Sequence, residues 1–242
     1  MGLDGMTSGI RGVLFDVDGT LYSQAPLRLL MAADLAASAA FGGSPRRAVR
    51  LARMLGEFRR TREALRDRGE FAGPLEDLQF ELTAGRINVE VEEVRRLVVE
   101  WILERPLKHM PRVRRRGLRQ LLATLASRGL RIGALSDYPV DSKLEALGIA
   151  EHFSLGLCTT DRVINAFKPH PKGFRHACAI WGLAPQEVLY VGDRPEVDGA
   201  GAAAAGMRCV IVGRHRGRDR PRDGEALVRA FGDLQRAFLD AA

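Results

Sequence analysis

Residues 12–20 of the chain read Gly-Val-Leu-Phe-Asp-Val-Asp-Gly-Thr, an apolar run that ends abruptly in two carboxylates, a glycine and a hydroxyl. The run up to Phe15 suits a strand buried on both faces, and Asp16 then stands at its carboxyl end, where open α/β sheets hold their sites. Asp16 and Asp18 are two residues apart, so both side chains can face one crevice. Because two carboxylates at close range repel each other, the stretch favours a hard divalent cation, a shared proton, or both. Taken alone, the pair Asp18-Gly19 favours a plain turn.

The chain after Pro106 alternates between helical and strand patterns. Apolar runs predict strands at residues 130–135, 153–158, 188–191 and 207–212, and the other segments predict helices at 118–127, 142–147, 172–181 and 197–205. Such alternation is typical of a parallel sheet with helices on both faces. The strand that ends at Asp16 needs neighbours, and these later strands can supply them.

Residues 25–105 show helical periodicity almost throughout and no strand pattern. Glycine breaks separate expected helices at 27–40, 45–68, 74–82 and 89–104, as antiparallel helices with short turns require. The simplest architecture inserts residues 23–106 as a helical cap between two parts of one core, residues 1–22 and 107–242. The predicted fold class is α/β, with a Rossmann-like parallel sheet core, helices on both of its faces, and an inserted all-helical cap that serves as a lid.

Three of the expected strands end in a polar residue. Asp16, Ser136 and Asp193 each follow an apolar run, and parallel strands bring such ends to one edge of the sheet. Lys168 stands in the segment Phe167-Lys168-Pro169-His170-Pro171, where prolines limit the freedom of the loop. Each residue alone is more typical of a turn, a solvated charge or a helix cap. Together and in this order they indicate phosphoryl-transfer chemistry.

These segments also resemble a known family. The sequence Asp16-Val17-Asp18-Gly19-Thr20-Leu21 closely resembles the first motif of the haloacid dehalogenase superfamily, most of whose members are magnesium-dependent phosphatases. Ser136, Lys168, and Gly192-Asp193 followed by Asp198 resemble the remaining three motifs in order. The resemblance covers the core, and in the cap it depends on position and helicity only.

The resemblance implies a catalytic role for each motif residue. A phosphate monoester is an anion, so the site must supply positive charge before the Asp16 carboxylate can attack phosphorus and form an aspartyl-phosphate. Asp18 then protonates the leaving alcohol and later accepts a proton from the attacking water. Lys168 supplies part of the positive charge, and Ser136 donates a hydrogen bond to a phosphoryl oxygen.

The resemblance also implies a metal site. Mg²⁺ is expected to bind the Asp16 carboxylate, the Asp18 backbone carbonyl and Asp193. Three residues have supporting roles: Thr20 braces the loop around Asp18, Asp137 follows Ser136, and Asp198 positions Lys168 or a metal-bound water.

The expected function is a Mg²⁺-dependent phosphatase of small phosphate monoesters that resemble phosphoglycolate, nucleotides or sugar phosphates. Dehalogenases of the superfamily lack the aspartate found here as Asp18, which argues against carbon-halogen chemistry. The nearest alternative is a phosphomutase similar to β-phosphoglucomutase, which the core motifs do not distinguish, and a nucleic-acid end phosphatase is less favoured. A catalytically idle binding protein would be expected to have replaced Asp16, Asp18, Lys168 or Asp193, and none is replaced.

The chain has 242 residues, a formal net charge of +7 and a pI near 9.9. This charge favours anionic partners but separates a phosphorylated metabolite from nucleic acid only weakly. Arginine clusters at residues 112–119 and 214–222 contain no interleaved aromatic residues, so we expect solvated surface rather than a nucleic-acid groove. Substrate specificity is expected from cap arginines such as Arg46, Arg47 or Arg50. No lysine precedes Lys108.

The cysteines and the apolar segments indicate the cellular compartment in which the protein is expected. Cys158, Cys178 and Cys209 lie in apolar contexts without paired or metal-ligand spacing, so they are expected to be reduced core residues of a cytoplasmic protein. No stretch offers the ~18 apolar residues that a membrane span needs, and no membrane partner is expected. The oligomeric state stays open.

Overall fold

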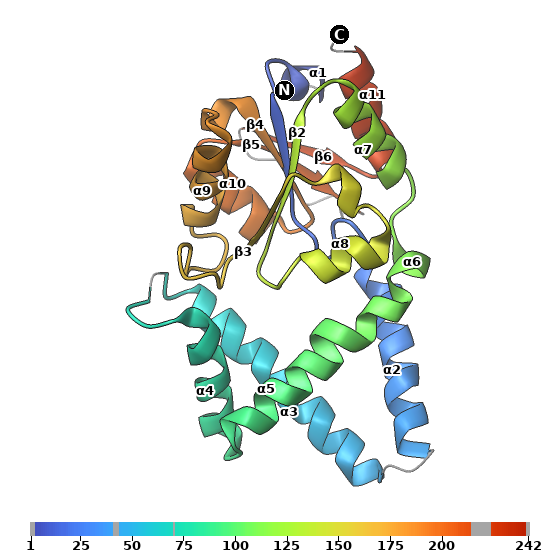
Figure 1. Cartoon of the computed structure of the whole chain (residues 1–242), viewed down its shortest axis with the longest axis vertical. Coiled ribbons are helices and arrows are strands. Elements are labelled where there is room, and N and C mark those ends of the chain that lie inside the picture. Colours follow the sequence, from blue (N-terminus) through green and yellow to red (C-terminus); the bar gives the residue numbers. More distant parts are fainter. Residues whose placement is uncertain (1–2, 41–43, 70, 214–223, 241–242) are drawn as a thin grey trace.

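The computed structural model describes residues 3–40, 44–69, 71–213 and 224–240, which form an α/β core and a set of helices facing one edge of it (Figure 1). The core contains a six-stranded sheet in which every neighbouring pair of strands is parallel. In sheet order the strands are β3 (Leu155–Cys158), β2 (Arg131–Ser136), β1 (Gly12–Phe15), β4 (Val188–Gly192), β5 (Arg208–Val212) and β6 (Glu225–Val228).

Helices cover both faces of the sheet (Figure 1). One face carries α1 (Leu3–Thr7), α7 (Leu118–Ser127), α8 (Asp141–Leu147) and α11 (Phe231–Asp240), and the other carries α9 (Lys172–Trp181) and α10 (Ala200–Ala205). Short helical turns lie at η3 (Ala150–His152), η4 (Pro185–Glu187) and η5 (Pro195–Gly199). The side chains of β1 alternate between the two faces: Val13 and Phe15 pack toward α7 and α11, and Leu14 packs toward α9. This confirms the predicted fold class.

The sequence did not predict the last strand and helix of the core. β6 has only four residues and begins at Glu225, and α11 follows after a short turn. A four-residue edge strand offers too little periodicity to distinguish it from a loop. The strand expected at residues 153–158 begins later, at Leu155, because residues 150–152 form a 3₁₀ turn.

The second layer is an insertion between β1 and β2. It contains α2 (Gln24–Ala40), α3 (Pro45–Arg66), α4 (Leu75–Ile87), α5 (Val91–Val98), a π-helical turn η1 (Val99–Glu104), a 3₁₀ turn η2 (Arg105–His109) and α6 (Met110–Val113). These helices share an apolar cluster of their own, in which Phe58 of α3 and Phe80 of α4 stack with ring centroids 5.4 Å apart. The insertion is therefore a helical cap with a separate core.

The two crossings between core and cap lie side by side. Tyr22 and Arg114 form an antiparallel bridge, the Ser23 amide donates to the Val113 carbonyl at 2.9 Å, and the Arg115 amide donates to the Leu21 carbonyl at 3.1 Å. The chain thus leaves and re-enters the core at adjacent points, as an inserted domain requires. The cap limits at residues 23 and 106 stay a prediction.

Three arginines of the first arginine cluster bond to loops of the core. Arg114 donates to the Leu147 carbonyl at 2.5 Å, Arg115 to the Gly19 carbonyl at 2.6 Å, and Arg119 to the Gly148 carbonyl at 2.8 Å. These three guanidinium groups bind loops of the core instead of facing only solvent. The second cluster, residues 214–222, lies outside the described residues.

Two further expectations concern cysteines and membranes. Cys158, Cys178 and Cys209 are buried and unpaired. In the part of the chain that the structure describes, no helix has the length and apolar character needed to cross a membrane.

Candidate active site

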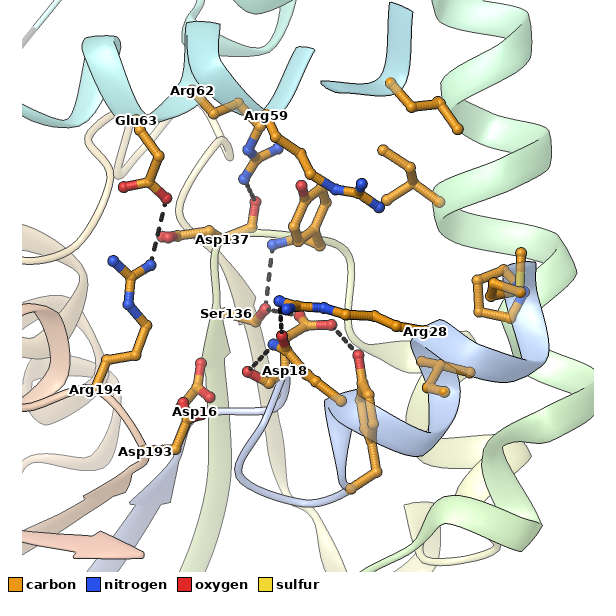
Figure 2. Close-up of a pocket in the computed structure, with 18 of the residues that line it drawn as sticks. Asp16, Asp18, Arg28, Arg59, Arg62, Glu63, Ser136, Asp137, Asp193 and Arg194 are labelled. Carbon is orange, nitrogen blue, oxygen red and sulfur yellow. Dashed lines mark hydrogen bonds and ion pairs between the residues drawn. The ribbon is translucent and has the colours of Figure 1, made fainter. Parts of the chain in front are cut away.

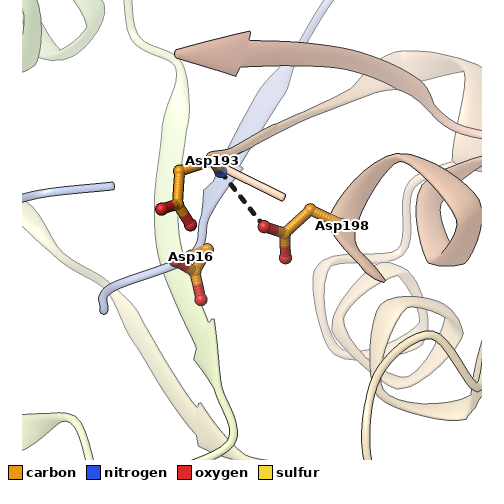
Figure 3. A group of neighbouring side chains, drawn as sticks. All are labelled: Asp16, Asp193 and Asp198. Atoms are coloured by element: carbon orange, nitrogen blue, oxygen red, sulfur yellow. Dashed lines mark hydrogen bonds between the residues drawn. The ribbon is translucent and has the colours of Figure 1, made fainter. Parts of the chain in front are cut away.

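Three adjacent strands deliver the predicted residues to one edge of the sheet. Ser136 ends β2, Asp16 follows β1, and Asp193 follows β4. Carboxylate oxygens of Asp16, Asp193 and Asp198 lie within 4.8 Å of one another (Figure 3). The residues that the sequence placed at strand ends are therefore neighbours in space.

Lys168 lies between two of these carboxylates. Its Nζ donates to Asp16 Oδ1 at 2.6 Å, to Asp198 Oδ1 at 2.7 Å and to the Tyr190 hydroxyl at 3.0 Å, and the residue is 3% exposed. Burial alone would lower the pKa of Lys168, but Asp16 and Asp198 outweigh that effect and raise it well above its ordinary value. Lys168 therefore carries a fixed positive charge beside Asp16.

Asp198 uses both of its oxygens within the protein. Oδ1 accepts from Lys168, and Oδ2 accepts from the backbone amides of Asp193 at 3.1 Å and Arg194 at 3.0 Å. Gly192 permits this close packing, because a Cβ there would lie 2.4 Å from Asp198. Although Asp198 belongs to the acidic cluster, these bonds suit it to positioning Lys168 and the Asp193 loop rather than to binding a metal.

Asp193 carries a buried oxygen without a partner. Its Oδ1 has no hydrogen-bond partner among the described residues, and burial, then Asp198, raises the pKa of Asp193 to about 7. Gly19 has φ +104° and comes so close to this carboxylate that a Cβ would lie 2.2 Å from Oδ2. Burial and neighbouring carboxylates also raise the pKa of Asp16, despite Lys168. A hard divalent cation between Asp16 and Asp193 would fit this excess of negative charge.

The third expected ligand, the backbone carbonyl of Asp18, accepts a hydrogen bond from Gln24 Nε2 at 2.8 Å. A carbonyl oxygen has two lone pairs, so this bond leaves one for a cation. Thr20 Oγ1 donates to Asp16 Oδ2 at 2.8 Å and so spans the loop that holds Asp18.

The Asp18 side chain is held by the predicted residue Ser136 and by two residues that the sequence analysis missed, Lys143 and Tyr22. Lys143 Nζ lies 2.5 and 2.7 Å from its two oxygens, the Tyr22 hydroxyl donates to Oδ1, and Ser136 Oγ donates to Oδ2 at 2.9 Å. Burial alone would raise the pKa of Asp18, but Lys143 and these hydrogen bonds outweigh it and lower the pKa. Lys143 shares the buried face of α8 with Leu144 and Leu147. A lysine on the apolar face of a helix was the signal available in the sequence.

Asp137 connects the core to the cap. Its Oδ2 pairs with Arg66 Nη1 at 2.8 Å, and its Oδ1 accepts from Thr159 Oγ1 at 2.8 Å and from the Lys168 amide at 3.3 Å. Burial raises the pKa of Asp137, but Lys168 and Arg66 outweigh it, so the pKa is lowered. Asp137 therefore positions both the Lys168 loop and helix α3.

Helix α3 supplies several of the cap's polar contacts to the core (Figure 2). Arg62, 4% exposed, donates to the Asp137 carbonyl and to Gln79 Oε1, and Arg66 also donates to the Lys168 carbonyl. Glu63 pairs with Arg194 Nη1 at 3.3 Å. The spacing of residues 59, 62, 63 and 66 places them on one helical face, a pattern that the sequence already contained.

The cap arginines expected to set specificity lie elsewhere. Arg46, Arg47 and Arg50 are near the other end of α3 and are not among the residues that line the pocket between core and cap, and Arg50 pairs with Glu93 at 3.0 Å. The lining of this pocket therefore does not support a role for the three arginines, and their part in specificity stays a prediction.

Together, the fold and the site define a class: a parallel α/β core with an inserted helical cap and a cluster of three aspartates, two of them buried, around a buried lysine. A family model described as haloacid dehalogenase-like hydrolase matches residues 10–206. The chain belongs to that family.

Its relatives include phosphatases. A phosphoserine phosphatase of Thermus thermophilus is 40% identical over 125 residues, which cover 50% of this chain and 48% of that protein, so the chain spans about half the length of that relative. A phosphoglycolate phosphatase of Yersinia pseudotuberculosis is 32% identical over 210 residues, which cover 83% of this chain and 80% of that protein. The crystal structure of a phosphatase of the same family from Thermococcus onnurineus superposes with a TM-score of 0.63 at 25% identity, covering 94% of this chain and 97% of that one.

Proposed function

We propose that the protein is a Mg²⁺-dependent phosphatase that hydrolyses small phosphate monoesters through an aspartyl-phosphate on Asp16. The observation that carries the proposal is the buried pair of Lys168 and Asp16 beside Asp193, whose Oδ1 lacks a partner among the described residues. A bound cation would supply positive charge to the phosphoryl oxygens and to the two carboxylates. The residues that would hold it are Asp16, the Asp18 carbonyl and Asp193.

Asp16 is the nucleophile in this proposal. Lys168 offsets the repulsion between its carboxylate and the dianionic phosphate, and Asp198 fixes Lys168 in place. Ser136 Oγ reaches the same edge of the sheet; its single O–H donates to Asp18 Oδ2 in the substrate-free site and would turn to donate to a phosphoryl oxygen when the substrate binds. Attack by Asp16 transfers the phosphoryl group to its carboxylate and releases the alcohol.

Asp18 acts as the acid and then as the base. It gives its proton to the leaving alcohol oxygen, and it regains a proton from the water that attacks the aspartyl-phosphate. Lys143, Tyr22 and Ser136 hold its side chain in one orientation. They also favour its ionised form in the substrate-free site, which is the form that accepts the proton from water. For the first step Asp18 must therefore take up a proton as the anionic phosphate ester binds, because that added negative charge raises the pKa of Asp18.

The test is a phosphate-release assay with phenyl phosphate and Mg²⁺ in H₂¹⁸O. We expect phenol and orthophosphate in equal amounts, with one ¹⁸O atom in the orthophosphate. No sugar bisphosphate activator is needed. In a parallel assay with glucose 1-phosphate, an isomerised sugar phosphate that forms faster than orthophosphate would instead assign the protein as a phosphomutase.

A further inference from the structure

The pocket between core and cap is larger and more apolar at its cap end than a phosphoryl site requires. It has a volume of about 560 Å³ and extends from Asp16 to a wall formed by Met31, Leu35, Leu55 and Trp101. Leu55 and Trp101 are 8% and 7% exposed and belong to the apolar cluster of the cap. Pockets of this size hold ligands well beyond a two-carbon alcohol.

Two cations line the same pocket without a carboxylate partner. Arg59 of α3 makes no hydrogen bond or ion pair with any described residue, and Arg28 of α2 donates only to the neutral Gln24 Oε1, at 2.7 Å. Figure 2 shows both side chains extending into the pocket from opposite helices. Their guanidinium groups are therefore available to a ligand.

The other cations of the pocket are already engaged. Arg66 pairs with Asp137, Arg62 donates to Gln79 and to the Asp137 carbonyl, and Lys168 lies between Asp16 and Asp198. Because Lys168 serves the phosphoryl group, Arg28 and Arg59 remain for the alcohol portion of the substrate. A guanidinium presents paired donors that match a carboxylate in a planar, two-bond geometry.

We propose that the substrate is a phosphate monoester whose alcohol portion combines an apolar body with a carboxylate. The apolar body lies against Trp101, Leu55 and Met31, and the carboxylate is bound by Arg59 together with Arg28. This substrate class is argued for the site of the proposed phosphatase and depends on that activity. It predicts that the substrate of the Yersinia relative, with a carboxylate but no apolar body, is a poor one here.

The experiment compares four esters that separate the two features. Ethyl phosphate has neither, phenyl phosphate has the apolar body, phosphoglycolate has the carboxylate, and 4-carboxyphenyl phosphate has both. With Mg²⁺ present, we expect kcat/KM for 4-carboxyphenyl phosphate to exceed that for phenyl phosphate by about tenfold, the factor that one charge-assisted hydrogen bond provides. It should exceed that for phosphoglycolate by about tenfold as well, because burial of the apolar body adds binding free energy. Preference for phosphoglycolate or ethyl phosphate would overturn the proposal.

Variants assign the two features to residues. In Arg59→Gln, kcat/KM for 4-carboxyphenyl phosphate divided by kcat/KM for phenyl phosphate should fall about tenfold, because KM for 4-carboxyphenyl phosphate rises. In Met31→Ala, kcat/KM for phenyl phosphate divided by kcat/KM for ethyl phosphate should fall, because the side chain that contacts the apolar body is shortened. Arg60→Gln is the matched control, because Arg60 is adjacent on α3, pairs with Glu57 and is not among the residues lining the pocket. Unchanged ratios in Arg59→Gln and Met31→Ala would overturn the proposal.

The outcomes also separate this proposal from the phosphatase assignment. If ethyl phosphate and phosphoglycolate are hydrolysed as fast as the aromatic esters, the phosphatase assignment stands and the substrate class is wrong. If folded protein releases orthophosphate from none of the four esters, both are wrong.

Discussion

The charged groups at the edge of the sheet differ from those on the facing side of α3 in how firmly they are held. Lys168, Asp16 and Asp198 are buried and fix one another by ion pairs of 2.6 and 2.7 Å. On α3, Arg66 is similarly fixed, whereas Arg59 is exposed and has no partner among the described residues. Chemistry on phosphorus needs charges placed before the substrate arrives, but recognition of the alcohol needs cations that are still free to bind.

The largest effect is expected from Asp16→Asn. The amide cannot attack phosphorus, so phosphate release should fall by about 10⁴-fold or more. Circular dichroism should show an unchanged fold. Asp67→Asn, an exposed carboxylate at the end of α3, is the control and should keep full activity. Substantial turnover by a folded Asp16→Asn variant would exclude Asp16 as the nucleophile.

Removal of metal should have the next largest effect. EDTA should abolish turnover and Mg²⁺ should restore it, whereas Ca²⁺, with its larger and looser shell, should restore little. Mg²⁺ should also raise Tm, because a ligand that binds only the folded state stabilises it. Asp193→Asn should remove this rise in Tm. Full activity in excess chelator would contradict the metal site.

The contact between helix α3 and the edge of the sheet includes the buried ion pair of Arg66 and Asp137, which a substitution can break. Arg66→Met leaves the Asp137 carboxylate buried without its guanidinium, which should lower the free energy of unfolding by about 3 kcal/mol. Urea denaturation measures this. The control Arg60→Met breaks an exposed pair on the same helix and should cost less than about 0.5 kcal/mol. Equal losses in the two variants would mean that the buried pair does not hold the cap.

The metal-free site should show an unusual pH dependence of stability. The folded-state pKa of Asp193 is about 7 and its ordinary value is 3.8, so between these values the folded protein binds the proton that the unfolded chain has lost. Stability in EDTA should therefore fall as pH rises from about 4 to 7, lowering Tm by roughly 5 °C. Asp193→Asn should flatten this slope. A Tm that rises over the same range in EDTA would contradict the raised pKa.

The smallest effect is expected at the exposed ion pair between Glu63 of α3 and Arg194 of the core. Arg194 and Glu63 are 39% and 53% exposed and pair at 3.3 Å. Glu63→Gln should cost about 0.5 kcal/mol of stability, and the effect should vanish in high salt. Glu63 also pairs with Arg66 at 3.1 Å. A loss as large as that of Arg66→Met would therefore contradict the small contribution expected of the Glu63 carboxylate.

The parallel sheet and the edge of it at which the motif residues gather follow from local sequence. The apolar run before Asp16 must be buried, and parallel strands place Asp16, Ser136 and Asp193 at one edge whatever the details of packing. Helical periodicity with glycine breaks was likewise enough to predict the cap. β6 escaped prediction because four residues at a sheet edge show no clear period.

The sequence by itself thus determined the fold class and the edge of the sheet at which the motif residues gather. Only the tertiary structure decided which distant side chains reach them: Lys143 meets Asp18 across 125 residues of sequence, and Arg62 meets Asp137 across 75. The reason is physical. Local burial and periodicity fix which face of an element is covered, but the angle and the depth at which α3 and α8 pack against the sheet depend on the whole core, and these determine which side chains touch.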